Sequence, residues 1–257
     1  MLFLLSPAKA LDYNSPAPAD LETTTPVFQA QAAELIKSLK TLSASEVGQL
    51  MHLSEKLAQL NHSRYQSWRA KPAASMTKAA ALAFNGDVYE GLDAPSLSAK
   101  QLDWLNSHLR ILSGLYGVLR PLDALQAYRL EMGTRFGVGG AENLYQYWKG
   151  RIAPHLNEVL AAGGHQHVIN LASGEYFKAV DVPALQVPVI ECRFEDYSKD
   201  QYKVVSFLAK RARGRMVRWA VLNKPRKPAD LQQFDDEGYV YAPALSQAQQ
   251  LVFQRKR

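Results

Sequence analysis

The sequence predicts one compact α/β domain of the α+β type, spanning residues 1–257, in which helices flank a mixed β-sheet. Short apolar runs typical of strands are interspersed with stretches that carry apolar residues at helical spacing, without the regular alternation of a purely parallel fold. The 257-residue chain is 47% hydrophobic and 10% aromatic, which is enough for one large core. No stretch has the composition of a linker.

The N-terminal half is predicted to begin with a buried strand at residues 1–5, followed by a surface connection at 14–26 that is rich in proline and threonine. Leucine and isoleucine then recur at helical spacing and indicate helices. Beyond these helices we expect a short strand at 81–89 that ends in a turn, a helix at 98–112 capped by Ser98, a glycine turn at 113–118, and a further helix with Pro121 at its first position.

The C-terminal half is predicted to contain the remaining sheet. A strand-like segment at 128–136 precedes a flexible turn at 137–140 and a long helix at 143–162 that stops at two glycines. We then expect strands at 167–171, 187–194 and 202–207, a short helix at 174–179 between the first two, a basic helix directly after the third, and a closing antiparallel hairpin of residues 239–241 and 251–254.

Composition argues against secretion and against a membrane location. No window approaches the roughly 18 apolar residues that a membrane-spanning helix needs. The apolar N-terminal run lacks a basic region and stops at Pro7, too early for a signal peptide. Cys192 is the single cysteine, so no intramolecular disulfide can form, and a reducing cytoplasm fits. We therefore expect a cytoplasmic protein.

The most distinctive feature is a basic segment at residues 201–229, which holds nine Lys or Arg residues and no Asp or Glu. On a helical wheel, one arc of the following helix is apolar and predicts a packed face. The apolar arc contains Leu208, Ala212, Met216, Trp219 and Ala220, and the opposite arc contains Lys210, Arg211, Gly214, Arg215 and Arg218.

This cationic arc predicts an anion-binding surface, because like charges without partners cost stability. Gly214 within it is expected to let a phosphate approach the backbone. Arg213 falls at the margin of the apolar face, where it needs a carboxylate or an anionic ligand. The alternative interpretation is a solubilising surface with Arg213 in an internal ion pair.

Three loops add candidate functional residues. Residues 113–118 contain Ser113, Gly114, Tyr116 and Gly117 and lie between two predicted helices, as in hairpins that offer N–H groups to DNA phosphates. Ser173 and Glu175 lie where a strand is followed by a helix, and Lys9 follows the first strand in the same way, which suggests one cleft. Arg129 and Glu131 are expected to share a strand face and to pair.

Catalytic and metal-binding signatures are not found in the sequence. The chain has no P-loop, no dinucleotide-binding glycine fingerprint and no nucleophile elbow around Ser173. His165 and His167 are close together but have no cysteine pair or carboxylate motif nearby, so we expect no metal and no cofactor.

Six motifs in order make the chain resemble the YaaA family of bacterial peroxide-stress-response proteins. They are SPAKALDY at 6–13, FNGDVYEGL at 84–92, LSGLYGVLRPLDALQAYRLEMGTRF at 112–136, NLYQYW at 143–148, INLASGEYFKAV at 169–180 and VVSFLAKRARGRM at 204–216.

The resemblance implies a protein induced by hydrogen peroxide that limits iron-dependent oxidative damage. It also implies a positively charged cleft, a helix-hairpin-helix element and binding to DNA, duplex or distorted, largely without regard to sequence. By motif, the hairpin is expected around residues 113–120. The predicted nucleic-acid-binding residues are Lys9, Ser113, Gly114, Tyr116, Gly117, Arg120, Arg129, Lys210, Arg211, Arg213, Gly214, Arg215 and Arg218.

Two other functions remain open from the sequence. An enzyme acting on a nucleotide or a damaged base would bind a nucleotide-like small molecule and use loop groups, of which Lys9, Asp87, Tyr116, Ser173 and Glu175 are chemically capable. Direct iron sequestration is disfavoured, because clustered carboxylates with histidine are not visible in the sequence. Any effect on iron is therefore expected to be indirect.

Overall fold

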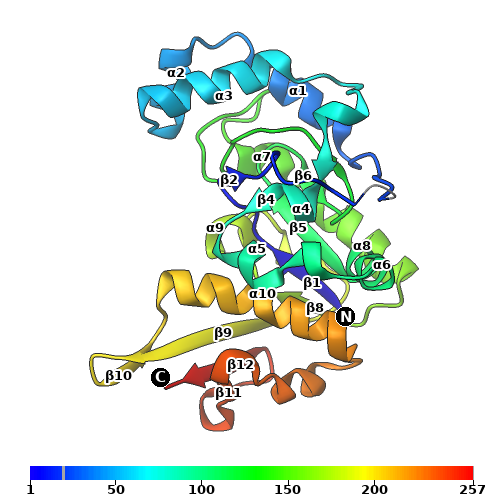
Figure 1. Cartoon of the computed structure of the whole chain (residues 1–257), viewed down its shortest axis with the longest axis vertical. Helices are drawn as coiled ribbons and strands as arrows, with labels where there is room; N and C mark the ends of the chain where they lie inside the picture. Colours follow the sequence, from blue (N-terminus) through cyan, green and yellow to red (C-terminus); the bar gives the residue numbers. More distant parts are fainter. Residues whose placement is uncertain (19–20, 257) are drawn as a thin grey trace.

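The computed structural model describes residues 1–18 and 21–256, and its centre is an eight-stranded mixed sheet (Figure 1). The strand order is β11-β12-β9-β8-β1-β5-β6, and β10 pairs with β9 beside this path. Strands β5, β1, β8, β9 and β12 run parallel, whereas β6, β10 and β11 pair antiparallel with their neighbours. The predicted mixed sheet is confirmed.

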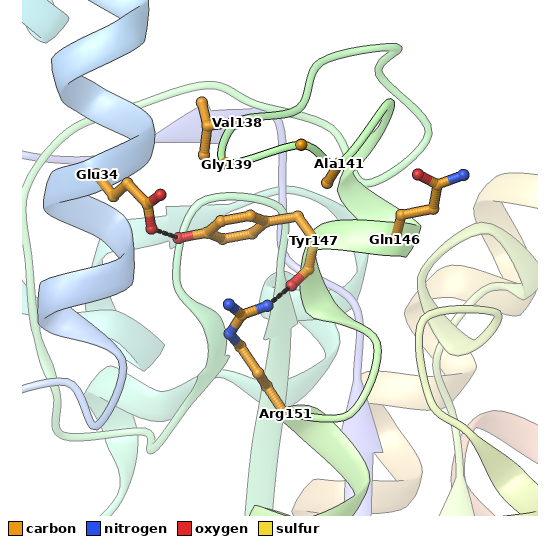
Figure 2. Close-up of a pocket in the computed structure, with 8 residues that line it drawn as sticks. Glu34, Val138, Gly139, Ala141, Gln146, Tyr147 and Arg151 are labelled. Carbon is orange, nitrogen blue, oxygen red and sulfur yellow. Dashed lines mark hydrogen bonds between the residues drawn. The ribbon is translucent and has the colours of Figure 1, made fainter.

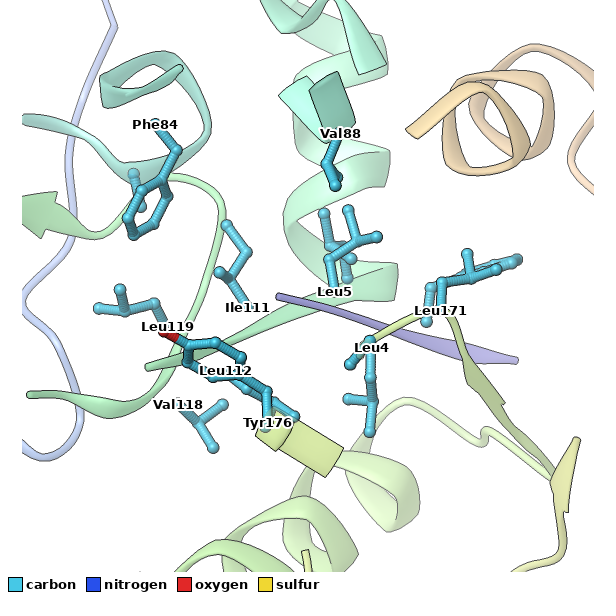
Figure 3. Close-up of a cluster of buried hydrophobic side chains, with 14 of the residues drawn as sticks. Leu4, Leu5, Phe84, Val88, Ile111, Leu112, Val118, Leu119, Leu171 and Tyr176 are labelled. Carbon is cyan, nitrogen blue, oxygen red and sulfur yellow. The ribbon is translucent and has the colours of Figure 1, made fainter. Parts of the chain in front are cut away.

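The central strands are short and almost wholly apolar. They are β1 (Leu2–Leu5), β5 (Leu109–Ser113), β6 (Gly117–Leu119) and β8 (Val168–Asn170), and all their residues are buried. Such continuous apolar runs form parallel strands that are covered on both faces. Figure 3 shows Leu5 and Val88 on one face and Leu4 and Tyr176 on the other, as the pleat requires.

The outer part of the sheet is built by the C-terminal region. Strand β9 (Val189–Ser198) is ten residues long and extends beyond β8, to which it pairs only through residues 189–191. It pairs with β10 (Gln201–Lys203) and along β12 (Gln250–Arg255), and β12 pairs with β11 (Val240–Tyr241). The predicted closing hairpin of β11 and β12 is confirmed.

Helices cover both faces of this sheet. On the face of Val88 lie α5 (Asp87–Leu92), the long α10 (Ser206–Asn223) and α6 (Ala99–His108), with α10 in contact with both of the others. Helix α9 (Gly174–Phe177) covers the opposite face. Helices α7 (Leu144–Trp148) and α8 (Ile152–Ala162) replace the single helix predicted at 143–162, because Gly150 adopts a left-handed φ of 73° and interrupts it.

A helical layer lies at one end of the molecule (Figure 1). It comprises α1 (Gln29–Leu39), α2 (Ala44–Met51) and α3 (Glu55–Ser67), as the leucine spacing predicted. Helix α2 begins with a capping box of Ser43 and Glu46 and ends at His52 in the left-handed conformation. Helices α2 and α3 pack against each other across this short turn.

Two predicted elements in the middle of the chain are wrong. The strand predicted at 81–89 is instead α4 (Ala80–Ala83), the two-residue β4 (Phe84–Asn85) and the start of α5. The helix predicted at 98–112 ends at His108, and its last residues form β5. A short buried apolar run fits a buried helix and a buried strand equally well, so periodicity cannot separate them.

The glycine segment at 113–118 is a β-hairpin, so the helix-hairpin-helix predicted there does not form. Ser113 of β5 is opposite Gly117 of β6, whose φ is 64°. No helix begins at Pro121, and the residues after it include β7 (Ala124–Leu125), which pairs with β3 (Lys78–Ala79). Residues 128–136 form no strand, and the remaining short strand, β2 (Ala10–Leu11), pairs with β4.

The surface connection predicted at residues 14–26 is described only in part, because residues 19 and 20 lie outside the described residues. Thr24 forms an isolated bridge with Asp123, and Pro26 is buried. Among the helices that the structure describes, none is long and apolar enough to cross a membrane.

Candidate functional site

The sheet has a topological switch point at the carboxyl ends of β1 and β8. The chain leaves β1 toward β5 on one side, and it leaves β8 toward β9 on the other side. The two loops therefore diverge, and open α/β sheets commonly bind ligands at such switch points. Residues 6–9 and 171–175 form these loops.

Two serines join the two loops. The Ser6 hydroxyl accepts a hydrogen bond from the Ser173 backbone N–H at 2.8 Å and donates to the Ser173 hydroxyl at 3.2 Å. The Tyr89 hydroxyl donates to the Ser6 carbonyl oxygen at 3.0 Å, and burial raises the pKa of Tyr89 well above its ordinary value. Both serines are partly buried and supply neutral hydrogen-bonding groups.

Charged groups lie beside these serines. Glu131 accepts from Arg129 at 2.8 Å and from Lys9 at 3.1 Å. Although partial burial acts to raise it, the pKa of Glu131 lies below its ordinary value because both cations donate to the carboxylate. The Arg129–Glu131 pair is as predicted, although its backbone is not a strand. Two cations and one carboxylate leave this cluster net positive.

Glu175 lies close to this cluster. Its carboxylate accepts from the Gly133 N–H at 3.0 Å, and Tyr145 donates to its backbone oxygen at 3.0 Å. Asp87 begins α5 and follows Gly86, where a Cβ would lie 3.5 Å from that of Ala8. The structure thus brings Lys9, Arg129, Ser173, Glu175 and Asp87 to the carboxyl edge of the sheet.

The residues of the 113–118 segment lie elsewhere, in the core. Ser113 and Tyr116 are fully buried, and the Trp68 indole donates to the Tyr116 hydroxyl at 2.9 Å. Burial raises the pKa of Tyr116 to about 12. A Cβ on Gly114 would lie 2.2 Å from the Leu130 carbonyl oxygen, and one on Gly117 would lie 2.6 Å from the Trp148 ring. These four residues pack the interior and offer no surface to a ligand.

The apolar face of α10 forms only in part as predicted, and its glycine does not have the expected role. Ala212, Met216 and Ala220 are buried, whereas Leu208 and Trp219 are only partly buried. Gly214 is buried as well, because α5 lies directly against it: a Cβ there would lie 1.8 Å from the Val88 carbonyl oxygen. The expectation that Gly214 admits a phosphate is therefore wrong.

Most arginines of the predicted cationic arc are paired within the protein. Arg211 donates to Glu237 at 2.7 Å, Arg215 to Asp236 at 2.6 Å, and Arg218 lies 3.3 Å from Asp93. These partners come from other segments of the chain. Arg120 is likewise paired, at 2.9 Å from Asp123. The positive charge of the arc is thus largely neutralised, which the sequence reasoning did not foresee.

Arg213 and Lys210 differ from these arginines. Arg213 forms no ion pair with any described residue, and its buried Nε has no hydrogen-bond partner there. Burial lowers its pKa, while Cys192 and Glu191 act in the opposite direction. Lys210 is exposed and forms no ion pair within the described part of the chain. The internal ion pair considered for Arg213 is therefore not formed.

A hollow outside the predicted site was missed entirely (Figure 2). It has a volume of about 350 Å³ and lies between α1 and α7. Tyr147 donates to Glu34 at 2.8 Å, and burial together with this carboxylate raises the pKa of Tyr147. The guanidinium of Arg151 lies 4.8 Å from the Tyr147 ring centre. Glu34 and Tyr147 are 113 positions apart, so no local pattern could reveal their contact.

Comparison with known proteins identifies the family. The family model described as peroxide stress protein YaaA matches residues 1–245. The chain belongs to this family. Its relatives include UPF0246 proteins of Delftia acidovorans, 54% identical over 100% of this chain and 99% of the relative, and of Bordetella pertussis, 54% identical over the full length of both. A UPF0246 protein of a Polaromonas species is 53% identical over 100% of this chain and 99% of its own.

Family membership places the chain among peroxide stress proteins and agrees with the motif resemblance. Of the residues at this switch point, Tyr89 was not singled out from the sequence. Glu131 was expected only as the partner of Arg129, and Ser6 belongs to the strand-end loop that suggested a cleft with Lys9. The signal that finds Ser6 is its place directly after the first strand.

Proposed function

We propose that the chain is a DNA-binding protein of the peroxide stress response, which binds the phosphate backbone largely without regard to sequence. Such binding would limit iron-dependent damage by covering DNA. One observation carries the proposal: Arg213 is a partly buried guanidinium that has no acidic partner among the described residues. Leaving a charge unpaired in a desolvated position is costly, and a phosphate relieves this cost.

The surroundings of Arg213 support an extended anionic partner. Lys210 is exposed one turn earlier on α10, and Tyr202 and Phe207 are 40% and 59% exposed near the start of that helix. Helix α5 connects this surface to the switch point, since Arg211 lies 3.9 Å from Glu90 of α5 and Gly86 lies against Ala8. Lys9 and Arg129 lie at the switch point, where they share the carboxylate of Glu131.

DNA binding is tested by fluorescence anisotropy with labelled duplexes of two unrelated sequences. We expect similar affinity for both and a steep loss between about 50 and 200 mM salt. Lys210→Glu combined with Arg213→Glu should reduce the affinity at least tenfold, and Arg213→Met alone should reduce it without reversing charge. Circular dichroism and urea unfolding verify that each variant is folded. Unchanged binding by the folded variants would refute the proposed surface.

A second candidate function is an enzyme that acts on a nucleotide or a damaged base. The observation that favours it is the switch point, where Ser6, Ser173 and Glu175 supply neutral and acidic groups and Lys9 supplies a cation. A base-excising enzyme needs a pocket for the flipped base, and the ends of parallel strands are a common place for one. Incubation with damaged DNA and chromatographic detection of released base or nucleoside separates the two: product that disappears in Ser173→Ala supports the enzyme.

The effect on iron is proposed to be indirect, through protection of DNA. The protein should then protect DNA from cleavage by ferrous iron and peroxide in vitro at saturating protein, and the Lys210→Glu, Arg213→Glu variant should not. Stoichiometric iron in the purified protein, measured by elemental analysis, would contradict this part of the proposal.

A further inference from the structure

A cavity of about 410 Å³ lies away from the switch point, between β5, β6, α8 and the segment before α1. Arg110 and Val118 form its inner part and are 93% and 100% buried, whereas Thr25 and Val27 are exposed at its mouth. Its remaining lining comes from Arg120, Asp123, His155 and Val159. Sites of this size with apolar walls and few polar groups are typical of small-molecule binding.

Arg110 has an unused hydrogen-bonding edge in this cavity. Its Nη1 donates to the carbonyl oxygens of Asn106 and Leu109 at 2.8 and 2.7 Å. Its Nε is buried without a partner, and Nη2 donates to no acceptor among the described residues. The Nε–H and Nη2–H groups of a guanidinium point the same way and match the two oxygens of a carboxylate or phosphate.

The charge of Arg110 is not compensated inside the protein. Asp123 is the acidic residue of the cavity, but it already accepts from Arg120 Nε at 2.9 Å, from the Arg120 backbone N–H at 2.8 Å and from Thr24 at 2.7 Å. Arg110 forms no ion pair within the described chain. One cation therefore remains in excess, in a position where desolvation makes an unpaired charge costly.

His155 also lines the cavity, and its pKa depends on the charge of Arg110. Burial lowers its pKa, Arg110 and Arg120 lower it further, and the exposed carboxylate of Glu158 at 3.6 Å acts to raise it. An anion that neutralises Arg110 would weaken the repulsion and raise the pKa of His155.

We propose that this cavity binds a small organic anion, whose carboxylate or phosphate group accepts from Arg110 Nε and Nη2 while its apolar body contacts Val27, Val118 and Val159. This site is separate from the DNA surface, and its test does not depend on DNA binding. The anion's charge would neutralise Arg110, and its apolar body would pack against the three valines that line the cavity.

The probes are benzoate and phenyl phosphate, which share one apolar ring and differ in the anionic group, with benzyl alcohol as the neutral control. Isothermal titration should detect binding of at least one anion and not of the alcohol. Preference for benzoate assigns a carboxylate, and preference for phenyl phosphate assigns a phosphate. If neither anion binds the wild-type protein, the proposal is overturned.

Two variants test whether Arg110 binds the anion or only stabilises the fold. Arg110→Lys keeps the charge but loses the planar fork, and we expect affinity to fall about tenfold or more. Arg193→Met, on the half-exposed Arg193 of β9, is the matched control and should bind as the wild type does. In the wild-type protein, NMR titration of His155 should show a higher pKa with the anion bound, and an unchanged pKa would place the anion elsewhere and overturn the proposal.

Discussion

A Cβ on Gly214 of α10 would lie 1.8 Å from the carbonyl oxygen of Val88 in α5. Gly91 of α5 has the reciprocal relationship, because its Cβ would lie 2.2 Å from the Arg211 carbonyl oxygen. The two helices therefore cross with their backbones in contact, and only glycine fits at either position. This crossing holds the basic helix α10 against α5, which begins at Asp87 close to the switch point.

Gly214→Ala should consequently destabilise the fold. The added methyl group meets backbone atoms that cannot rotate away, and overpacking of this kind costs about 1–3 kcal/mol or more. Urea unfolding measures the loss. Gly174→Ala is the matched control, since nothing lies within 4 Å of its Cβ position and its φ is not left-handed, and it should change stability by less than about 0.5 kcal/mol. Equal stability of the two variants would contradict the close crossing.

Lys210→Gln should weaken DNA binding through the loss of one phosphate contact. We expect the slope of log affinity against log salt to fall by about 1, with an equal effect on every duplex sequence. Anisotropy titrations at several salt concentrations measure the slope. Arg226→Gln, at an exposed cation beyond the far end of α10, serves as the control and should leave the slope unchanged. A variant that alters preference among sequences would instead indicate contact with bases.

Tyr116→Phe should lower stability and leave DNA affinity unchanged. The substitution removes the acceptor of the buried Trp68 indole N–H, and an unsatisfied buried donor costs about 1–3 kcal/mol. Urea unfolding and anisotropy of the same sample test both parts. Loss of DNA affinity in a protein that remains fully folded would restore Tyr116 to the binding surface.

Ser6→Ala should loosen the contact between the two loops at the switch point. The Ser173 N–H, which donates to the Ser6 hydroxyl at 2.8 Å, loses its acceptor, at a cost of about 1 kcal/mol because the site is only partly buried. Hydrogen exchange of the Ser173 amide, followed by NMR, should accelerate more than that of amides in α3. An unchanged exchange rate would show that the bond does not hold the loops together.

Stability should fall as pH drops from about 6.5 toward 4, partly through His165. Burial lowers the pKa of this side chain to about 4, from an ordinary value near 6.5, and the N-terminal amine lies 3.3 Å from its Nδ1. The unfolded chain therefore binds a proton that the folded chain rejects, which costs at most about 1.4 kcal/mol per pH unit in this window. Urea midpoints at several pH values measure the slope, and His165→Gln should flatten it.

Several elements could be read from local sequence. The leucine and isoleucine spacing of α1 was read correctly, because Leu35, Ile36 and Leu39 form its buried face and so recur at the helical period. The continuous apolar runs at β1 and β8 mark strands that are covered on both faces. The boundary between α6 and β5 could not be read in this way. The hydrogen bonds of β5 to β1 and β6 decide it, and those strands lie outside the local window.

In the candidate site, too, local sequence predicted some features and only the tertiary contacts decided others. The sequence correctly indicated that Lys9 and Ser173 lie at strand ends, since loops after parallel strands meet at one edge. It could not show which cations are neutralised. Arg218 and Asp93 are 125 positions apart, and Arg211 and Glu237 are 26 apart, so their pairing follows only from the packing of α10.

The sequence by itself determined the family, the α/β class and the amphipathic character of α10, because these depend on residue order and on periods within single elements. The tertiary structure decided that Gly214 is a packing residue and that Arg213 and Arg110 are cations without acidic partners in the described chain. A charge is neutralised by whatever side chain lies within a few ångströms, and that neighbour is set by the contacts between distant segments.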